Sequence, residues 1–259
     1  MAPAAGAGLT PQLSASALEA LPDVGTGDDL AALVEAAAPP DLNDGDVLVI
    51  AHKVVSKAEG RVRSLDDIEP GQRALELAAE HGKDARLVQA VLDESAELLR
   101  ARDGVFICAT RHGFVCANAG VYQSNASRPG ELILLPSDPD ESARRLRARI
   151  SELRGVRPAI VVADSFGRPW RLGQTDVAIG AAGLVALDDW SGRPDGYGRE
   201  LRVSAVAIAD AAASAADLAR GKDSRRPAVL VRGLARYVTA DDGAGAAVLR
   251  RAPEQDLFR

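Results

Sequence analysis

The residues with the clearest potential for chemistry follow a short apolar run near the middle of the chain. Residues 157–162, RPAIVV, are mostly apolar and β-branched, which predicts a buried strand. Asp164 and Ser165 come just after this run and offer carboxylate and hydroxyl oxygens. Hard cations such as Mg²⁺ and Mn²⁺ accept these ligands, usually with phosphate completing the coordination shell. The pair therefore predicts a metal site, although a capped loop without any ligand is an alternative.

Anion-binding residues follow in the same stretch. Arg168 and Arg171 can each pair with phosphate or carboxylate through two hydrogen bonds. Gly167 and Gly173 permit a ligand to approach the backbone closely. The alternative is a pair of solvated arginines around a packed tryptophan. Taken together, the cation ligands and the arginines favour a binding site at the mouth of the strand.

Two further polar clusters come earlier in the chain. Residues 51–61, AHKVVSKAEGR, place His52 and Lys57 just after a predicted strand. Lysine can serve as a compact counter-ion for phosphate, whereas an exposed basic loop is the alternative. Asn125 lies in a glycine-containing loop after another apolar run, where a simple turn also explains it.

Two charged, glycine-containing segments come later. The first carries Asp195, Arg199 and Glu200. The second, residues 219–227, is strongly basic and includes Gly221 and Lys222. A basic loop in an otherwise acidic protein suggests an anionic ligand, while a solubilising turn is the alternative.

Composition excludes several classes of protein. The chain has 259 residues, ordinary globular composition and a net charge of −6, which argues against a general nucleic-acid binder. No apolar run is long enough to span a membrane, and the first residues lack the pattern of a signal peptide. Cys108 and Cys116 are expected to be buried thiols in a reducing compartment. We therefore expect a cytoplasmic protein that binds neither nucleic acid nor membrane.

The elements that must position these residues alternate irregularly between helices and strands, with hairpins among them. This pattern predicts an α+β (mixed α/β) fold with mixed sheets, neither Rossmann nor P-loop, because the GxGxxG and GxxxxGK[ST] motifs are absent. We expect a loose start at 1–14, one domain over 15–250 and a surface tail at 251–259. The predicted helices cover 27–38, 70–82, 84–102 and 138–155; the predicted strands cover 45–55, 131–136, 157–165 and 226–233; a hairpin covers 104–120, an extended segment covers 175–190, a polar loop covers 56–72, and residues 200–221 change from strand to helix near Ala209.

Several stretches, in their order along the chain, resemble one known family. They are LPDVGTGDDL, AHKVVSKAEGR, CANAGV followed by SN, ADSFGRPWRLGQTDVAIGAAG, RPDGYGREL and ARGKD followed by PAVLVRG. Their combination is similar to the coenzyme F-420-0:γ-glutamyl ligase family. The resemblance covers about residues 21–233, and the stretch after Asp164 is its most specific part.

The resemblance implies an activity and a set of partners. Such ligases couple GTP hydrolysis to amide formation between L-glutamate and the phospholactyl carboxylate of a deazaflavin precursor, and then add γ-linked glutamates. They use Mg²⁺ or Mn²⁺, with K⁺ as a helper ion. The resemblance also implies a family-specific fold with two intertwined subdomains and an intertwined homodimer. Some relatives carry a further nitroreductase-like domain, and we expect the stand-alone ligase form here.

The resemblance also implies roles for individual residues. Asp164 and Ser165 correspond to metal ligands, and the basic loop at residues 219–226 to part of the GTP site. The expected GTP contacts are Leu21, Pro22, Asp23, Val24, His52, Lys57, Asn125, Gly221 and Lys222. Our own candidates for holding substrate phosphate or glutamate are Arg168, Arg171, Asp195, Arg199 and Glu200.

One position departs from the family. Tyr122 stands where the family usually has an aspartate that shares a metal with the residue at Asp164. A phenol, with an ordinary pKa near 10, is a poor ligand for a hard cation. We expect one metal site to be lost, shifted or completed by Asp176 or Asp195. The alternatives are a divergent paralogue that ligates an amine to another carboxylate, and a non-catalytic protein that binds GTP or a deazaflavin.

Overall fold

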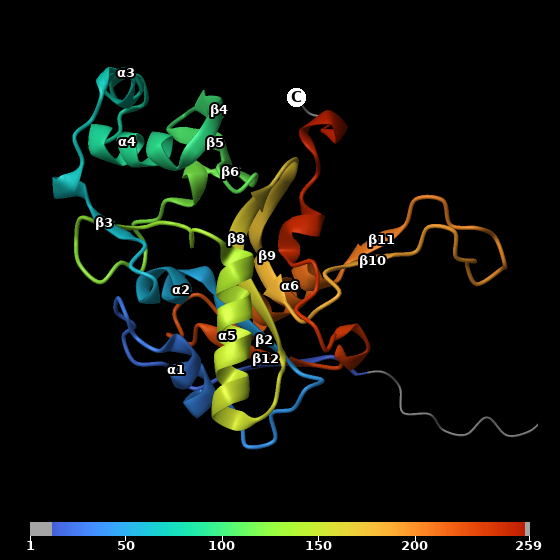
Figure 1. Cartoon of the computed structure of the whole chain (residues 1–259). Helices are drawn as coiled ribbons and strands as arrows, with labels where there is room; N and C mark the ends of the chain where they lie inside the picture. Colours follow the sequence, from blue (N-terminus) through green and yellow to red (C-terminus); the bar gives the residue numbers. More distant parts are fainter. Residues whose placement is uncertain (1–11, 257–259) are drawn as a thin grey trace, which may run out of the picture.

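A five-stranded mixed sheet forms the centre of the protein, of which a computed structural model describes residues 12–256 (Figure 1). Only β2 and β8 run parallel, and every other neighbouring pair is antiparallel. This mixed order confirms an α+β fold and differs from a doubly wound parallel sheet. The strands, in their order across the sheet, are β1 (Ser14–Ala17), β12 (Ala228–Arg232), β2 (Val47–Ala51), β8 (Ala159–Arg168) and β9 (Arg171–Ala182).

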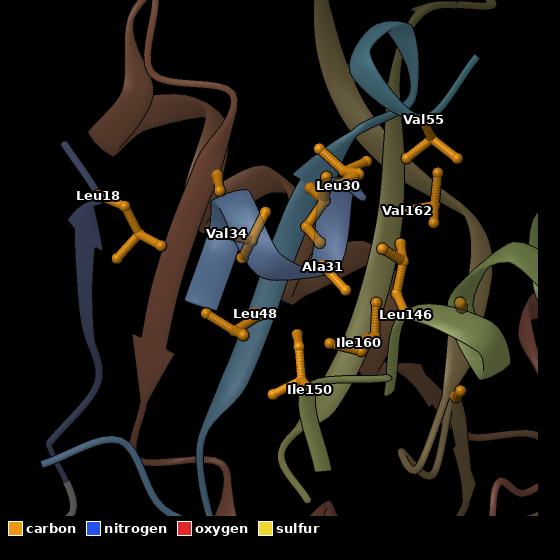
Figure 2. Close-up of a cluster of buried hydrophobic side chains, with 14 of the residues drawn as sticks. Leu18, Leu30, Ala31, Val34, Leu48, Val55, Leu146, Ile150, Ile160 and Val162 are labelled. Carbon is orange, nitrogen blue, oxygen red and sulfur yellow. The ribbon is translucent and has the colours of Figure 1, made fainter. Parts of the chain in front are cut away.

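Helices cover both faces of this sheet because the central strands are apolar on both sides. On β2, Leu48 and Ile50 pack against the cluster that includes α1 and α5, shown in Figure 2, while Val47 and Val49 pack against α6. Successive side chains of a strand point to opposite faces, which explains this division. The helices are α1 (Leu30–Ala37), α5 (Pro139–Arg154) and α6 (Ile208–Arg220).

A second layer with its own apolar cluster lies beyond one end of the main sheet (Figure 1). There α3 (Gln72–His81) and α4 (Ala85–Glu94) pack with a three-stranded antiparallel sheet. Its strands are β4 (Ser95–Arg102), β5 (Val105–Thr110) and β6 (Val115–Ala117).

The predicted helix over residues 84–102 is wrong in its second half. The helix ends at Glu94, and the next eight residues form β4, which pairs with β5. The apolar spacing of the segment fits a helix, but pairing with the neighbouring strand overrides that local preference. The hairpin predicted over 104–120 is confirmed, and it is extended by this third strand.

The strand predicted over 45–55 is too long, because β2 ends at Ala51 and a helix, α2 (His52–Ala58), begins at once. His52, Val55 and Ser56 are buried on one face of α2, which is the spacing of a helix. The change of direction after β2 turns the imidazole of His52 into the interior. The loop predicted over 56–72 also contains β3 (Val62–Ser64), which pairs with β7 (Glu131–Ile133).

The remaining elements are short. The extended segment predicted at 175–190 is confirmed by β9 and by β10 (Leu187–Asp189), and α6 begins one residue before Ala209. β10 pairs with β11 (Ala205–Ala207), and their connection protrudes from the body of the molecule (Figure 1). The 3-10 helices are η1 (Leu65–Asp67), η2 (Asn118–Gly120), η3 (Ala235–Tyr237), η4 (Ala246–Leu249) and η5 (Pro253–Gln255).

The ends of the chain bear on the predicted domain limits, which stay predictions. Most of the start expected to be loose, residues 1–11, lies outside the described residues, and β1 begins at Ser14. The last described segment, residues 251–256, is mainly exposed and includes η5. Within residues 12–256 there is no helix of the length and apolarity that a membrane crossing requires.

Candidate functional site

A long hairpin brings the central polar residues together. β8 and β9 pair so that Ser165, the residue after Asp164, lies directly opposite Asp176. The Ser165 hydroxyl donates a hydrogen bond to Oδ1 of Asp176 across 2.5 Å. Both carboxylates are buried, with 4% of Asp164 and 1% of Asp176 exposed. Burying a charge without partners is costly, so each carboxylate requires donors or cations beside it.

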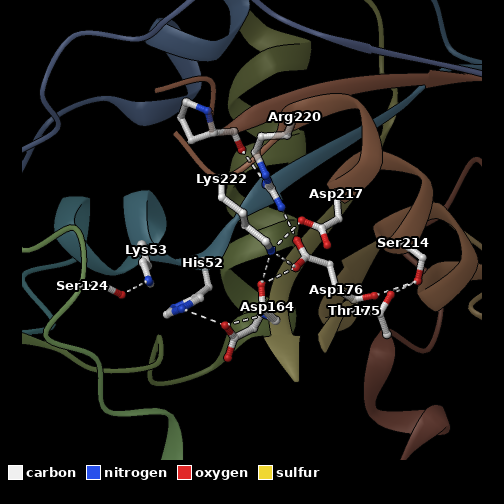
Figure 3. Close-up of polar contacts among 12 residues, drawn as sticks. His52, Lys53, Ser124, Asp164, Thr175, Asp176, Ser214, Asp217, Arg220 and Lys222 are labelled. Carbon is white, nitrogen blue, oxygen red and sulfur yellow. Dashed lines mark hydrogen bonds and ion pairs between the residues drawn. The ribbon is translucent and has the colours of Figure 1, made fainter. Parts of the chain in front are cut away.

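Cations for Asp176 come from the end of α6. The Arg220 guanidinium forms an ion pair with Oδ2 of Asp176. Gly221 then ends the helix with a φ of +70°, and the chain turns so that Lys222 returns to the site. The Lys222 ammonium donates to the Ser165 hydroxyl over 3.0 Å and to Asp217 over 2.8 Å, as Figure 3 shows.

Asp164 has different partners, which are mostly neutral. The Tyr122 hydroxyl is 2.9 Å from Oδ1 and 2.8 Å from Oδ2, and it donates to this carboxylate. The backbone amide of Ser165 donates to Oδ1 over 2.8 Å. Nε2 of His52 lies 3.1 Å from Oδ1 without hydrogen-bond geometry. Among the described residues, this buried nitrogen has no hydrogen-bond partner.

Burial changes the proton affinity of the groups around Asp164. It raises the pKa of Tyr122 well above its ordinary value, and the negative charge of Asp164 adds to the effect. The phenol therefore stays protonated and remains a hydrogen-bond donor. Burial also lowers the pKa of Lys53, an effect that Asp164 opposes. The Lys53 ammonium lies 4.5 Å from the centroid of the Tyr122 ring and donates to Ser124 over 2.7 Å.

The structure places several predicted nucleotide contacts around this cluster. His52 and Lys222 contact it directly. Lys57 lies on α2, and its charge helps to lower the pKa of Lys53. Asn125 is exposed and follows Ser124, with a φ of +62°. The segment before α1 is tied to the end of α2 by a hydrogen bond from the Gly27 amide to the Ala58 carbonyl. Of the four predicted contacts in that segment, Pro22 and Asp23 are exposed, Leu21 is partly buried and Val24 is buried.

The predicted substrate residues do not join the cluster within one chain. Arg168 pairs with Arg171 at the tip of the β8–β9 hairpin, where both are exposed. Asp195 accepts a hydrogen bond from the Arg199 amide in a turn of the protruding β10–β11 connection, where Glu200 is exposed (Figure 1). Their roles stay predictions. Of the two acids expected to complete the metal site, Asp176 lies beside Ser165, whereas Asp195 lies on this connection.

Of the two buried carboxylates at the β8–β9 hairpin, Asp176 has the better arrangement for binding a divalent cation. Asp176 and the Ser165 hydroxyl supply hard oxygen ligands, and a phosphate could complete the shell. Lys222, which contacts both, is 65% exposed and has room to move. At Asp164 the Tyr122 hydroxyl lies between the two oxygens, where a cation held by both of them would sit, whereas the donors to Asp176 approach one oxygen each. No group of three or more His, Cys, Asp or Glu side chains suited to a metal occurs within residues 12–256.

Two contributors to the site were not anticipated from the sequence. Asp217 accepts a hydrogen bond from Lys222, and Ser124 accepts one from Lys53. Asp217 could have been found from its spacing, because it lies about one helical turn before the glycine that ends α6. Ser124 carried no comparable signal, since a serine in a polar loop is ordinary.

Sequence comparisons relate the chain to known proteins. The sequence profile described as F420-0:Gamma-glutamyl ligase matches residues 20–233. The chain is 48% identical over 235 residues to the coenzyme F420:L-glutamate ligase of Methanopyrus kandleri, covering 90% of this chain and 92% of that protein. It is 44% identical over 251 residues to the ligase of the same name from Methanothermobacter thermautotrophicus, covering 95% and 99%. The chain therefore belongs to the F420-0:gamma-glutamyl ligase family.

Proposed function

We propose that the protein is a GTP-dependent ligase that joins L-glutamate to the phospholactyl carboxylate of a deazaflavin precursor and then adds γ-linked glutamates. Two relatives named coenzyme F420:L-glutamate ligase align with this chain over 92% and 99% of their own length. The observation that carries the proposal is the cluster of two buried carboxylates, a hydroxyl and several cationic side chains on neighbouring elements. Such a cluster suits the binding of a triphosphate with its cation.

The chemistry explains why a phosphate site is needed. A carboxylate is a poor acyl donor, so its oxygen first attacks the γ-phosphorus of GTP, and GDP leaves with the bridging oxygen. The amine of glutamate then attacks the carbonyl carbon of the acyl phosphate. The bond from that carbon to the phosphate oxygen breaks, inorganic phosphate leaves with one oxygen of the original carboxylate, and the amine loses a proton. The product is an amide.

The side chains of the cluster suit the phosphoryl-transfer step. Lys53 approaches the carboxylates from α2 and Lys222 from the end of α6, where both can neutralise and orient phosphate oxygens (Figure 3). Asp176 and Ser165 would hold Mg²⁺ or Mn²⁺, which offsets phosphate charge when bound. Arg220 holds Asp176 in position. K⁺ as a helper ion and a homodimer are further parts of the proposal, implied by the family alone.

The contact of Tyr122 with Asp164 keeps one alternative open. A protein with this altered site could bind GTP without turning it over. Mass spectrometry separates the two functions: the protein is incubated with the deazaflavin precursor, L-glutamate, Mn²⁺ and K⁺, with GTP, with ATP or with neither. The ligase predicts a product heavier by one or more glutamyl units with GTP alone. An unchanged precursor, with bound GTP recovered intact, supports the binding protein.

A further inference from the structure

Tyr122 closes the face of Asp164 that a cation would use. Its hydroxyl is almost equally distant from the two carboxylate oxygens, at 2.9 and 2.8 Å. A cation held by both oxygens of a carboxylate would occupy this position. The Ser165 amide adds a third hydrogen bond, to Oδ1. Asp164 therefore receives its donors from the chain itself.

The Tyr122 side chain is fixed in this place by its surroundings. Its backbone exchanges two hydrogen bonds with Ile133, of 2.9 and 2.8 Å. Its ring lies 5.1 Å from the His52 ring, between centroids, and the Lys53 ammonium lies over it. Moving the hydroxyl away from Asp164 would disturb both ring contacts, while the backbone bonds hold the residue in place. The closure is thus part of the packed interior and not a contact of a free surface side chain.

We propose that Tyr122 keeps divalent cations off Asp164, so that the chain binds one such cation, through Asp176 and Ser165. The role of the bound cation rests on the proposed function. The number of cations bound does not depend on it. Asp164 then acts as a positioning residue, because it holds the hydroxyl of Tyr122, whose ring contacts His52 and Lys53. A change at Tyr122 that opens the carboxylate creates a second cation site.

Counting bound Mn²⁺ tests this inference without any turnover. The electron paramagnetic resonance signal of free Mn²⁺ is titrated with wild-type protein, Tyr122→Asp, Tyr122→Ala and the control Leu75→Asp. Leu75 is exposed on α3, so the control adds a negative charge far from the site. Wild type and Leu75→Asp should bind one Mn²⁺, and Tyr122→Asp should bind a second one. Melting temperatures with and without Mn²⁺ report whether each variant is folded.

The outcomes are distinct. Binding of two Mn²⁺ ions, or of none, by the wild-type protein would overturn the inference. The same conclusion follows if both Tyr122 variants bind one ion with unchanged affinity. If Tyr122→Asp does not fold, Tyr122→Ala decides alone, because it removes the hydroxyl and the ring without adding charge. Failure of the proposed ligase activity would leave these counts unchanged, so the two failures can be told apart.

Discussion

The hydroxyl of Ser165 on β8 donates to the carboxylate of Asp176 on β9 across 2.5 Å, and the two residues are direct partners in the hairpin register. This pair joins the two strands at the polar end of an otherwise apolar hairpin. Lys222 reaches the same hydroxyl from the end of α6. The site is therefore built from three elements that meet only in the folded protein.

Replacing Ser165 with alanine should reduce turnover while leaving the fold intact. The substitution removes an oxygen ligand and the donor that orients Asp176, and the loss of such a partner typically costs about 10–100-fold. Steady-state rates of GDP release in the presence of precursor and glutamate measure the effect. Ser151→Ala, on α5, is the matched control and should behave as wild type. Equal rates for both variants would remove Ser165 from the site.

Replacing Arg220 with methionine should destabilise the protein strongly. Asp176 is 1% exposed, so the variant leaves a buried carboxylate without its closest cation, which costs about 3–5 kcal/mol of unfolding free energy. Urea unfolding measures this loss. Adding Asp176→Asn should restore most of the stability but not the activity. If the double variant is as active as wild type, Asp176 serves the fold alone.

Replacing Arg147 with methionine should also destabilise the protein, for a reason unrelated to the site. This side chain is 1% exposed, and it donates to the carbonyls of Thr239 and Asp241 and to the Asp242 carboxylate. Loss of this buried network should lower the unfolding free energy by about 3–5 kcal/mol. Arg145→Met removes an arginine of the same helix that is 60% exposed, and it should cost less than about 1 kcal/mol. Similar losses in both variants would contradict this account.

Stability should fall as the pH drops below about 6.5, partly because of His112. Burial lowers the pKa of this histidine in the folded protein, against opposition from the Pro136 carbonyl and from Glu94. The unfolded chain, with an ordinary histidine pKa near 6.5, then binds the proton more readily. Stability is therefore fully present above that pKa and decreases toward the lower, folded value. Melting temperatures between pH 8 and 5 should fall less for His112→Gln, and an equal fall would exclude this contribution.

The sequence predicted the chemistry of the hairpin better than its geometry. The apolar run before Asp164 and the residues after it were enough to expect a strand and oxygen ligands there. That the polar residues remain in β8 up to Arg168 could not be seen, because strand pairing with β9 holds them extended. For the same reason, the expected role of Arg168 and Arg171 beside the carboxylates has no support within one chain.

Other features depend on contacts that are remote in sequence. Residues 95–102 have the apolar spacing of a helix, and only their pairing with β5 makes them a strand. Tyr122 was recognised as an unsuitable metal ligand from its chemistry. Its contact with both oxygens of Asp164, 42 positions away, required the folded structure.

One experiment tests the central claim most directly. The deazaflavin precursor is labelled with ¹⁸O in its carboxylate and incubated with the protein, GTP, Mn²⁺, K⁺ and L-glutamate. Mass spectrometry then follows the precursor and the released phosphate in the same sample. The account predicts a precursor heavier by at least one glutamyl unit and phosphate that carries one ¹⁸O atom. Unlabelled phosphate with the glutamylated product would contradict the acyl-phosphate route, and an unchanged precursor would contradict the ligase itself.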